Sequence, residues 1–203
     1  MKTFTKHPNF KPALMEQLAW HRSQDRIARV GYGKIGDDFR GCAIGCAINS
    51  LRLAGFCTLS SDDHAGLAEE IGVPESLLRL ADHLFENLPS AESLEWPHRF
   101  FNAIPEGVDL SLVVNKWLYW LLVDPVEGVL CLAKTEKTKA AIHRVAELHL
   151  LTLRGGEVTN EEWALEARAA WAAREAGEAG EARAAWASSK QAAKLIELLA
   201  EAK

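Results

Sequence analysis

The sequence predicts an all-α protein, with a compact multi-helix domain followed by a long alanine-rich C-terminal helix or helical hairpin. Apolar residues recur at helical spacing along nearly the whole chain. Capping residues, prolines and glycines stand where these periodic segments begin and end. No segment shows the sustained apolar–polar alternation of a strand. Apolar residues make up 48% of the 203 residues, enough to build a sizeable core.

The first third is expected to hold two helices joined by a glycine-rich loop. Pro12 suits the first turn of a helix that runs to about Arg29. Residues 31–41 (GYGKIGDDFRG) form the longest loop-like stretch of the chain. Residues 42–54 then predict a helix of small residues, which Gly55 ends.

The middle of the chain predicts a series of shorter helices. Ser61 or Asp62 can cap a helix that ends at Gly72, and Pro74 begins the next, through about Leu88. Three more helices are expected, from Ser90 to near Pro105, from Leu110 to Val123 after a cap at Asp109, and from Thr135 to Leu153.

The C-terminal segment is richest in alanine. Thr159 can cap a run from residue 160 to about 200, in which the sequence EARAAWA at 166–172 recurs at 181–187. As one helix, this run would be about 60 Å long. We predict a core domain over residues 1–156 and a helical arm over residues 157–203. We expect the arm to pack on the core or on a second copy of the chain. We predict a homo-oligomer that forms through the arm.

Aromatic residues divide between these two parts. Trp96, Trp117, Tyr119 and Trp120 are expected to build the core. Large aromatic side chains at spaced positions on an alanine helix suit a seam between helices or a dimer contact. We expect this role for the arm tryptophans, Trp163, Trp171 and Trp186.

Charge and cysteine usage limit the compartment and the partners. No stretch of 18 apolar residues is present, and the N-terminus lacks the apolar region of a signal peptide. We therefore expect no membrane association. Four cysteines do not make a disulfide scaffold, so we expect reduced thiols and a cytoplasmic location. Residues 1–60 hold nine Lys/Arg against four Asp/Glu, a net +5, whereas residues 61–203 hold fourteen against twenty-four, a net −10. The basic third can attract an anion, or the two parts can simply pack together.

Two motifs invite a nucleotide or DNA interpretation. GYGKIG at 31–36 matches GxGxxG, but no strand–helix–strand unit surrounds it, which excludes a dinucleotide fold. The loop is then either an anion-binding turn, with Lys34 and Arg40 supplying charge, or a plain connection. Residues 67–81 have helix-turn-helix spacing. However, residues 61–95 hold nine acids against one base, which excludes DNA as a partner.

The cysteines and one histidine leave further alternatives open. Cys42 and Cys46 share a helix face, and Cys57 and His64 follow close in sequence. Four such ligands could hold zinc, but buried thiols inside a helix are commoner. A nucleophilic Cys–His pair is the other alternative. We predict neither a metal nor a cofactor.

An ordered set of motifs carries a resemblance. It comprises RGCAIGC at 40–46, DH at 63–64, EIGVP at 70–74, FENLP at 85–89, WP at 96–97, AIP at 103–105 and the Ala/Trp/Arg tail. Together they resemble a family of alanine-rich helical proteins from bacteriophages, prophages and GC-rich bacterial genomes. The resemblance implies an accessory protein that acts in a bacterial host cell, and it transfers no catalytic role.

The sequence therefore predicts a binding protein and not an enzyme. Its ligand is a small anionic, nucleotide-like molecule, and sequestration of a host immune signal becomes a hypothesis. The alternatives are a protein–protein inhibitor of a host defence or regulatory protein, and a thiol- or metal-dependent enzyme. The predicted ligand-binding residues are Gly33, Lys34, Arg40, Gly41, Cys42 and His64.

Overall fold

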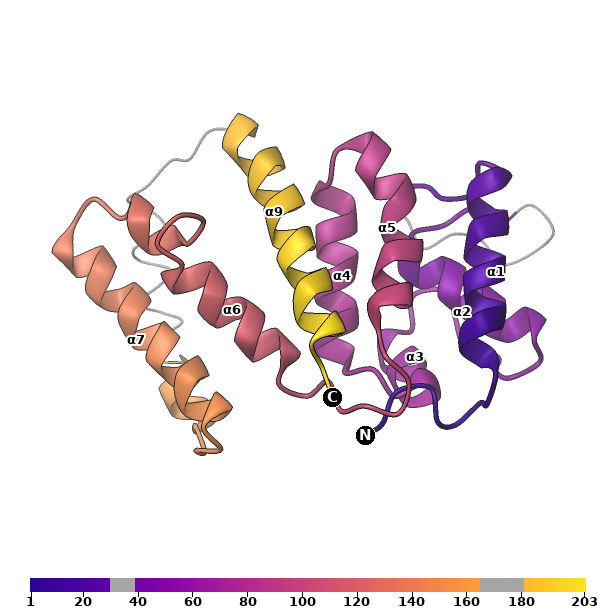
Figure 1. The fold of residues 1–203 in the computed structure, drawn as a ribbon, viewed down its shortest axis with the longest axis horizontal. Coiled ribbons are helices and arrows are strands. Elements are labelled where there is room, and N and C mark those ends of the chain that lie inside the picture. The colour runs from indigo at the N-terminus through magenta and orange to yellow at the C-terminus, as the bar shows by residue number, and fades with distance from the viewer. Residues whose placement is uncertain (30–38, 165–180) are drawn as a thin grey trace. The chain divides into compact units, whose positions relative to one another are not determined.

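The computed structural model describes residues 1–29, 39–164 and 181–203, and this part of the chain is helical (Figure 1). Its β-pairing is limited to two isolated bridges, Lys2 with Asp109 and Ile27 with Gly41. The predicted all-α class is confirmed. The described residues divide into two compact units, one formed by Met1–Ser111 with Ala192–Lys203, the other by Leu112–Gln191.

Helix α1 (Phe10–Ser23) ends six residues before the predicted boundary at Arg29. The backbone of Asp25 takes a left-handed conformation (φ 53°), which breaks the helical path. Beyond it, Ala28 N donates to Gly41 O at 2.9 Å, and Gly41 N donates to Arg26 O at 3.0 Å. This short parallel bridge ties the end of the α1 segment to the residues just before α2.

Helix α2 (Ala43–Leu53) follows the prediction closely and lies in the core. The cap of α3 (His64–Ile71) is Asp63, and not Ser61 or Asp62 as predicted; Asp63 accepts a hydrogen bond from Gly66 N at 2.8 Å. Gly72 ends α3 in a left-handed conformation (φ 70°), as predicted.

Helices α4 (Glu75–Asn87) and α5 (Ser90–Ala103) are each preceded by a proline, Pro74 and Pro89. Helix α5 begins at Ser90, as predicted. Pro97 lies inside α5, where its missing N–H interrupts the hydrogen-bond ladder.

The second unit centres on α6 (Val113–Val123) and α7 (Glu136–Leu153), which pack against each other, with a short 3-10 helix η1 (Val129–Leu132) between them in sequence. Asp109 does not cap α6; it accepts from Ser111 N in a turn before the helix. The helix predicted from Thr135 begins one residue later, because Thr135 is its cap and accepts from Thr138 N.

The arm begins as predicted, with Thr159 and Glu162 forming a reciprocal cap. Thr159 N donates to Glu162 Oε2 at 2.8 Å, and Glu162 N donates to Thr159 Oγ1 at 3.2 Å. A single 41-residue helix is not evident. The described C-terminal helix, α9 (Glu181–Ala200), has 20 residues, and residues 165–180, which include Trp171, lie outside the described part. The compact units are bounded at residues 111 and 191, whereas the sequence prediction set its boundary at 156; the packing of the arm and the homo-oligomer stay predictions.

The core of the first unit is aromatic. Its largest fully buried side chains are Phe10, Phe39, Phe85, Trp96, Phe100 and Phe101. Each such burial contributes about 1.5–3 kcal/mol relative to an exposed side chain. The indole of Trp96 also donates to Ala81 O at 2.9 Å, which fixes α5 to α4.

Two of the remaining aromatic predictions can be followed in the second unit. Trp117 is 4% exposed and donates to Gln191 O at 2.9 Å, whereas Tyr119 and Trp120 are half-buried. Trp163 lies 4.7 Å from the ring of His149 on α7, so it makes an interhelical contact of the predicted kind.

Candidate functional site

The predicted site residues do not form one cluster. Gly33 and Lys34 lie outside the described residues. Among the other four, Arg40 lines a pocket with Asp25 and Phe39, whereas His64 lines a different pocket with residues of α4. Gly41 and Cys42 lie between them in the chain.

The backbone of Gly41 is already engaged. Its N–H and its carbonyl are both used in the bridge to the 26–28 segment, and the Cys46 thiol lies 3.6 Å from the same carbonyl. The predicted role of the Gly41 amide in holding an anion is therefore not supported by its hydrogen bonding.

Cys42 is the N-cap of α2, where its sulfur accepts from Gly45 N at 3.5 Å. The side chain is 1% exposed, and burial, followed by the neighbouring charge of Asp82, raises the pKa of its thiol well above the usual range. Burial also raises the pKa of Cys46 to about 12. Both groups are thus protonated thiols near pH 7, which argues against a thiolate nucleophile at either position.

The zinc alternative finds no ligand set either. Across the described ranges, no three or more His, Cys, Asp or Glu residues come together in a way that could hold a metal ion. Cys42 and Cys46 are buried, Cys57 is half-buried and Cys131 is exposed, all as free cysteines.

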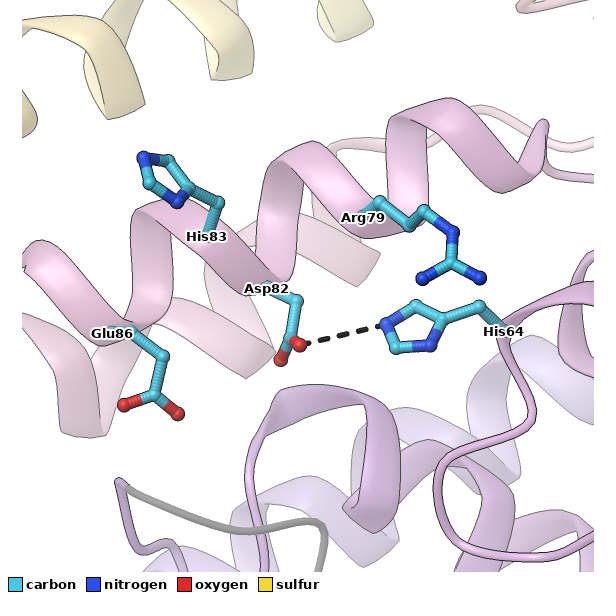
Figure 2. Close-up of a pocket in the computed structure, with 5 residues that line it drawn as sticks. All are labelled: His64, Arg79, Asp82, His83 and Glu86. Atoms are coloured by element: carbon cyan, nitrogen blue, oxygen red, sulfur yellow. Dashed lines mark ion pairs between the residues drawn. The ribbon is translucent and has the colours of Figure 1, made fainter.

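Figure 2 shows the residues that line the pocket of His64, namely His64, Arg79, Asp82, His83 and Glu86. The volume of this pocket is about 290 Å³. Helix α4 presents four of these residues. Arg79, Asp82 and Glu86 are three and four residues apart, a spacing that places side chains on one face of a helix. His64 approaches them from the first turn of α3, because the Asp63 cap fixes where that helix starts.

His64 is held between two acceptors. Its Nδ1 lies 3.0 Å from the backbone oxygen of Asp62, and its Nε2 lies 3.5 Å from Asp82 Oδ2. A neutral imidazole carries one N–H, which can donate to one of these two oxygens. The side chains of His64 and Asp82 are 2% and 13% exposed, so this is a nearly buried pair. The contact joins the start of α3 to α4.

The remaining groups give the pocket charged side chains of both signs. Arg79 lies at its rim, with a 61% exposed side chain that pairs with Glu75 at 2.6 Å. The lining combines one guanidinium, Arg79, and two imidazoles, His64 and His83, with two carboxylates, Asp82 and Glu86. The pocket can therefore contact a ligand that carries both an anionic group and N–H donors.

Sequence reasoning missed Arg79, Asp82, His83 and Glu86. Their spacing on a predicted helix was visible, but surface helices commonly carry such charges. What marks these four is their meeting with His64, which depends on how α3 packs against α4.

No family model, curated protein or solved structure matches this chain. None of the helices in the described residues combines the length and the apolar character needed to cross a membrane.

Proposed function

We propose that the chain is a non-enzymatic binding protein for a small nucleotide-like ligand, which it holds in the pocket around His64. The observation that carries the proposal is the convergence of His64, Arg79, Asp82 and Glu86 in one pocket. Nucleotides combine an anionic phosphate with a base that bears N–H groups, and this set of side chains complements both.

Arg79 is the residue proposed to take the phosphate. Its guanidinium is largely exposed, and exposed ion pairs such as that with Glu75 contribute only about 0–1 kcal/mol. A phosphate accepts the paired hydrogen bonds of a guanidinium as a carboxylate does, and it carries more negative charge. Replacing Glu75 by a phosphate as the ion-pair partner of Arg79 therefore costs little free energy.

Asp82 and Glu86 are proposed to read the base. Carboxylates accept hydrogen bonds from the ring and exocyclic N–H groups of a nucleobase. Asp82 already holds His64 through Oδ2, and its Oδ1, although buried, has no hydrogen-bond donor within the described part of the chain. The terminal torsion of Asp is soft, so a modest rotation can turn Oδ1 toward a ligand.

Size and reactivity also support binding without catalysis. The volume of about 290 Å³ is at the lower limit of small-molecule sites, which suits a base or a mononucleotide. The neighbouring Cys42 is a protonated, buried thiol, which is a poor nucleophile. The resemblance to phage proteins extends the proposal to sequestration of a host signal.

The test is isothermal titration calorimetry of the full chain against linear and cyclic nucleotides. Glu86→Gln should weaken binding of the best ligand by roughly ten- to a hundredfold, as expected when a charged hydrogen-bond acceptor is lost. Glu69→Gln, an exposed residue of α3 outside the pocket, is the matched control and should bind as the wild type does. Absence of heat across the whole panel, or equal binding by the Glu86 variant, contradicts the proposal.

A further inference from the structure

We infer that the pocket around Arg40 is a second binding site, which takes a small multivalent anion. The buried imidazole of His21 donates a hydrogen bond to this anion. This site is lined by Gln24, Asp25, Arg26, Phe39 and Arg40 and has a volume of about 260 Å³. It shares no residue with the His64 pocket.

The lining charges favour an anion. Among the described residues that line the pocket, Arg26 and Arg40 carry guanidinium groups and Asp25 carries a carboxylate. Arg26 lies over the ring of Trp20, 4.6 Å from its centroid, which orients its planar group. Arg40 pairs with Asp25 at 3.1 Å, but the two side chains are 58% and 84% exposed, so a phosphate can displace this carboxylate.

The second observation is the state of His21, in the last turn of α1. Its side chain is 0% exposed, and neither ring nitrogen has a hydrogen-bond partner within the described residues. Buried polar atoms are nearly always satisfied, so an orphaned imidazole requires an explanation. Core packing does not supply one, because an apolar ring would fill the same space without that cost.

His21 lies next to the pocket lining. Its ring centroid is 5.3 Å from that of Phe39, and the backbone N–H of Arg26 donates to its carbonyl at 2.8 Å. Burial, and then the charge of Arg26, lowers the pKa of His21 to about 4. The ring is therefore neutral near pH 7 and carries one N–H, which an anion can accept once the Phe39 ring changes rotamer.

The probe for this site is inorganic pyrophosphate, titrated into the full chain by calorimetry. We expect binding by the wild type, a loss of tenfold or more in Arg40→Gln, and a loss of several fold in His21→Phe. Arg22→Gln is the matched control, because Arg22 is also an exposed arginine of the same region in an ion pair, with Glu95, and lies outside the pocket. It should bind as the wild type does.

Thermal unfolding supplies the readout that separates ligand contact from packing. His21→Phe removes two orphaned polar atoms, so its melting temperature should rise while its affinity for pyrophosphate falls. Should Phe not fit, His21→Leu is the second variant. No pyrophosphate binding by the wild type at millimolar concentration, or unchanged affinity in Arg40→Gln or in both His21 variants, would overturn the inference. Glu86→Gln should leave pyrophosphate binding unchanged, so this site and the His64 pocket succeed or fail separately.

Discussion

The burial of His21 makes the stability of the folded protein depend on pH. Its pKa is lowered to about 4 in the folded chain and returns to about 6.5 on unfolding. Below pH 6.5 His21 binds a proton in the unfolded state but stays neutral in the folded state. Its contribution to the free energy of unfolding is therefore fully present above that pH and is lost as the pH falls toward 4. The full loss from this residue is ~3 kcal/mol.

Denaturant unfolding measured from pH 8 to pH 4 checks this expectation. His149, whose pKa burial also lowers, contributes in the same direction, so the wild-type slope contains both histidines. The difference between the wild type and His21→Phe isolates His21. Parallel stability curves for the two proteins would show that His21 is protonated normally in the folded state.

The cysteines should differ in reactivity according to their surroundings. Cys131 is exposed, whereas Cys42 and Cys46 are buried thiols whose pKa values are raised. Mass spectrometry after brief alkylation of the native protein should find Cys131 modified at least tenfold faster than either buried thiol, because the thiolate is the reactive form. Rapid modification of Cys42 would show that it is an accessible, activated group and would reopen the nucleophile alternative.

At the scale of the elements, one turn depends on the absence of a side chain. Gly72 ends α3 with φ 70°, and a Cβ there would collide with the backbone carbonyl of Lys2. Gly55 has a similar φ of 76° but open space around the position of its Cβ. Gly55→Ala therefore reports the cost of the left-handed backbone alone, about 1–2 kcal/mol.

Gly72→Ala should cost more than Gly55→Ala, by at least 1 kcal/mol, because the collision adds to the same backbone strain. The free energies of unfolding of the two variants, from urea titration, give the comparison directly. Equal losses in both would mean that the N-terminal segment does not pack on the end of α3.

The ends of the elements also show what the sequence could predict. Caps made by neighbouring residues were visible, as at Thr159 and Gly72, because the donor and acceptor lie within one turn. The end of α1 was missed, since it depends on the bridge between the 26–28 segment and Gly41, a contact across the glycine-rich loop. Local chemistry could be predicted; pairing between distant segments could not.

The same distinction holds for the whole molecule. The helical class followed from periodicity over the full chain, whereas the predicted binding residues His64 and Arg40 line two different pockets. Their assignment to one site was wrong, because sequence proximity to Gly41 and Cys42 suggested a contact that the packing of α1, α3 and α4 does not make. Only the tertiary structure shows that Asp82 and Glu86 lie in the same pocket as His64.

The central claim is that Arg79 holds the anionic group of a nucleotide-like ligand in the His64 pocket. The most direct measurement is a cycle that combines Arg79→Gln with removal of the phosphate from the ligand, with dissociation constants for nucleotide and matching nucleoside in both proteins. We predict that the wild type binds the nucleotide at least tenfold more tightly, and that this advantage disappears in Arg79→Gln but persists in Arg22→Gln. An advantage of the same size in the Arg79 variant would contradict the account.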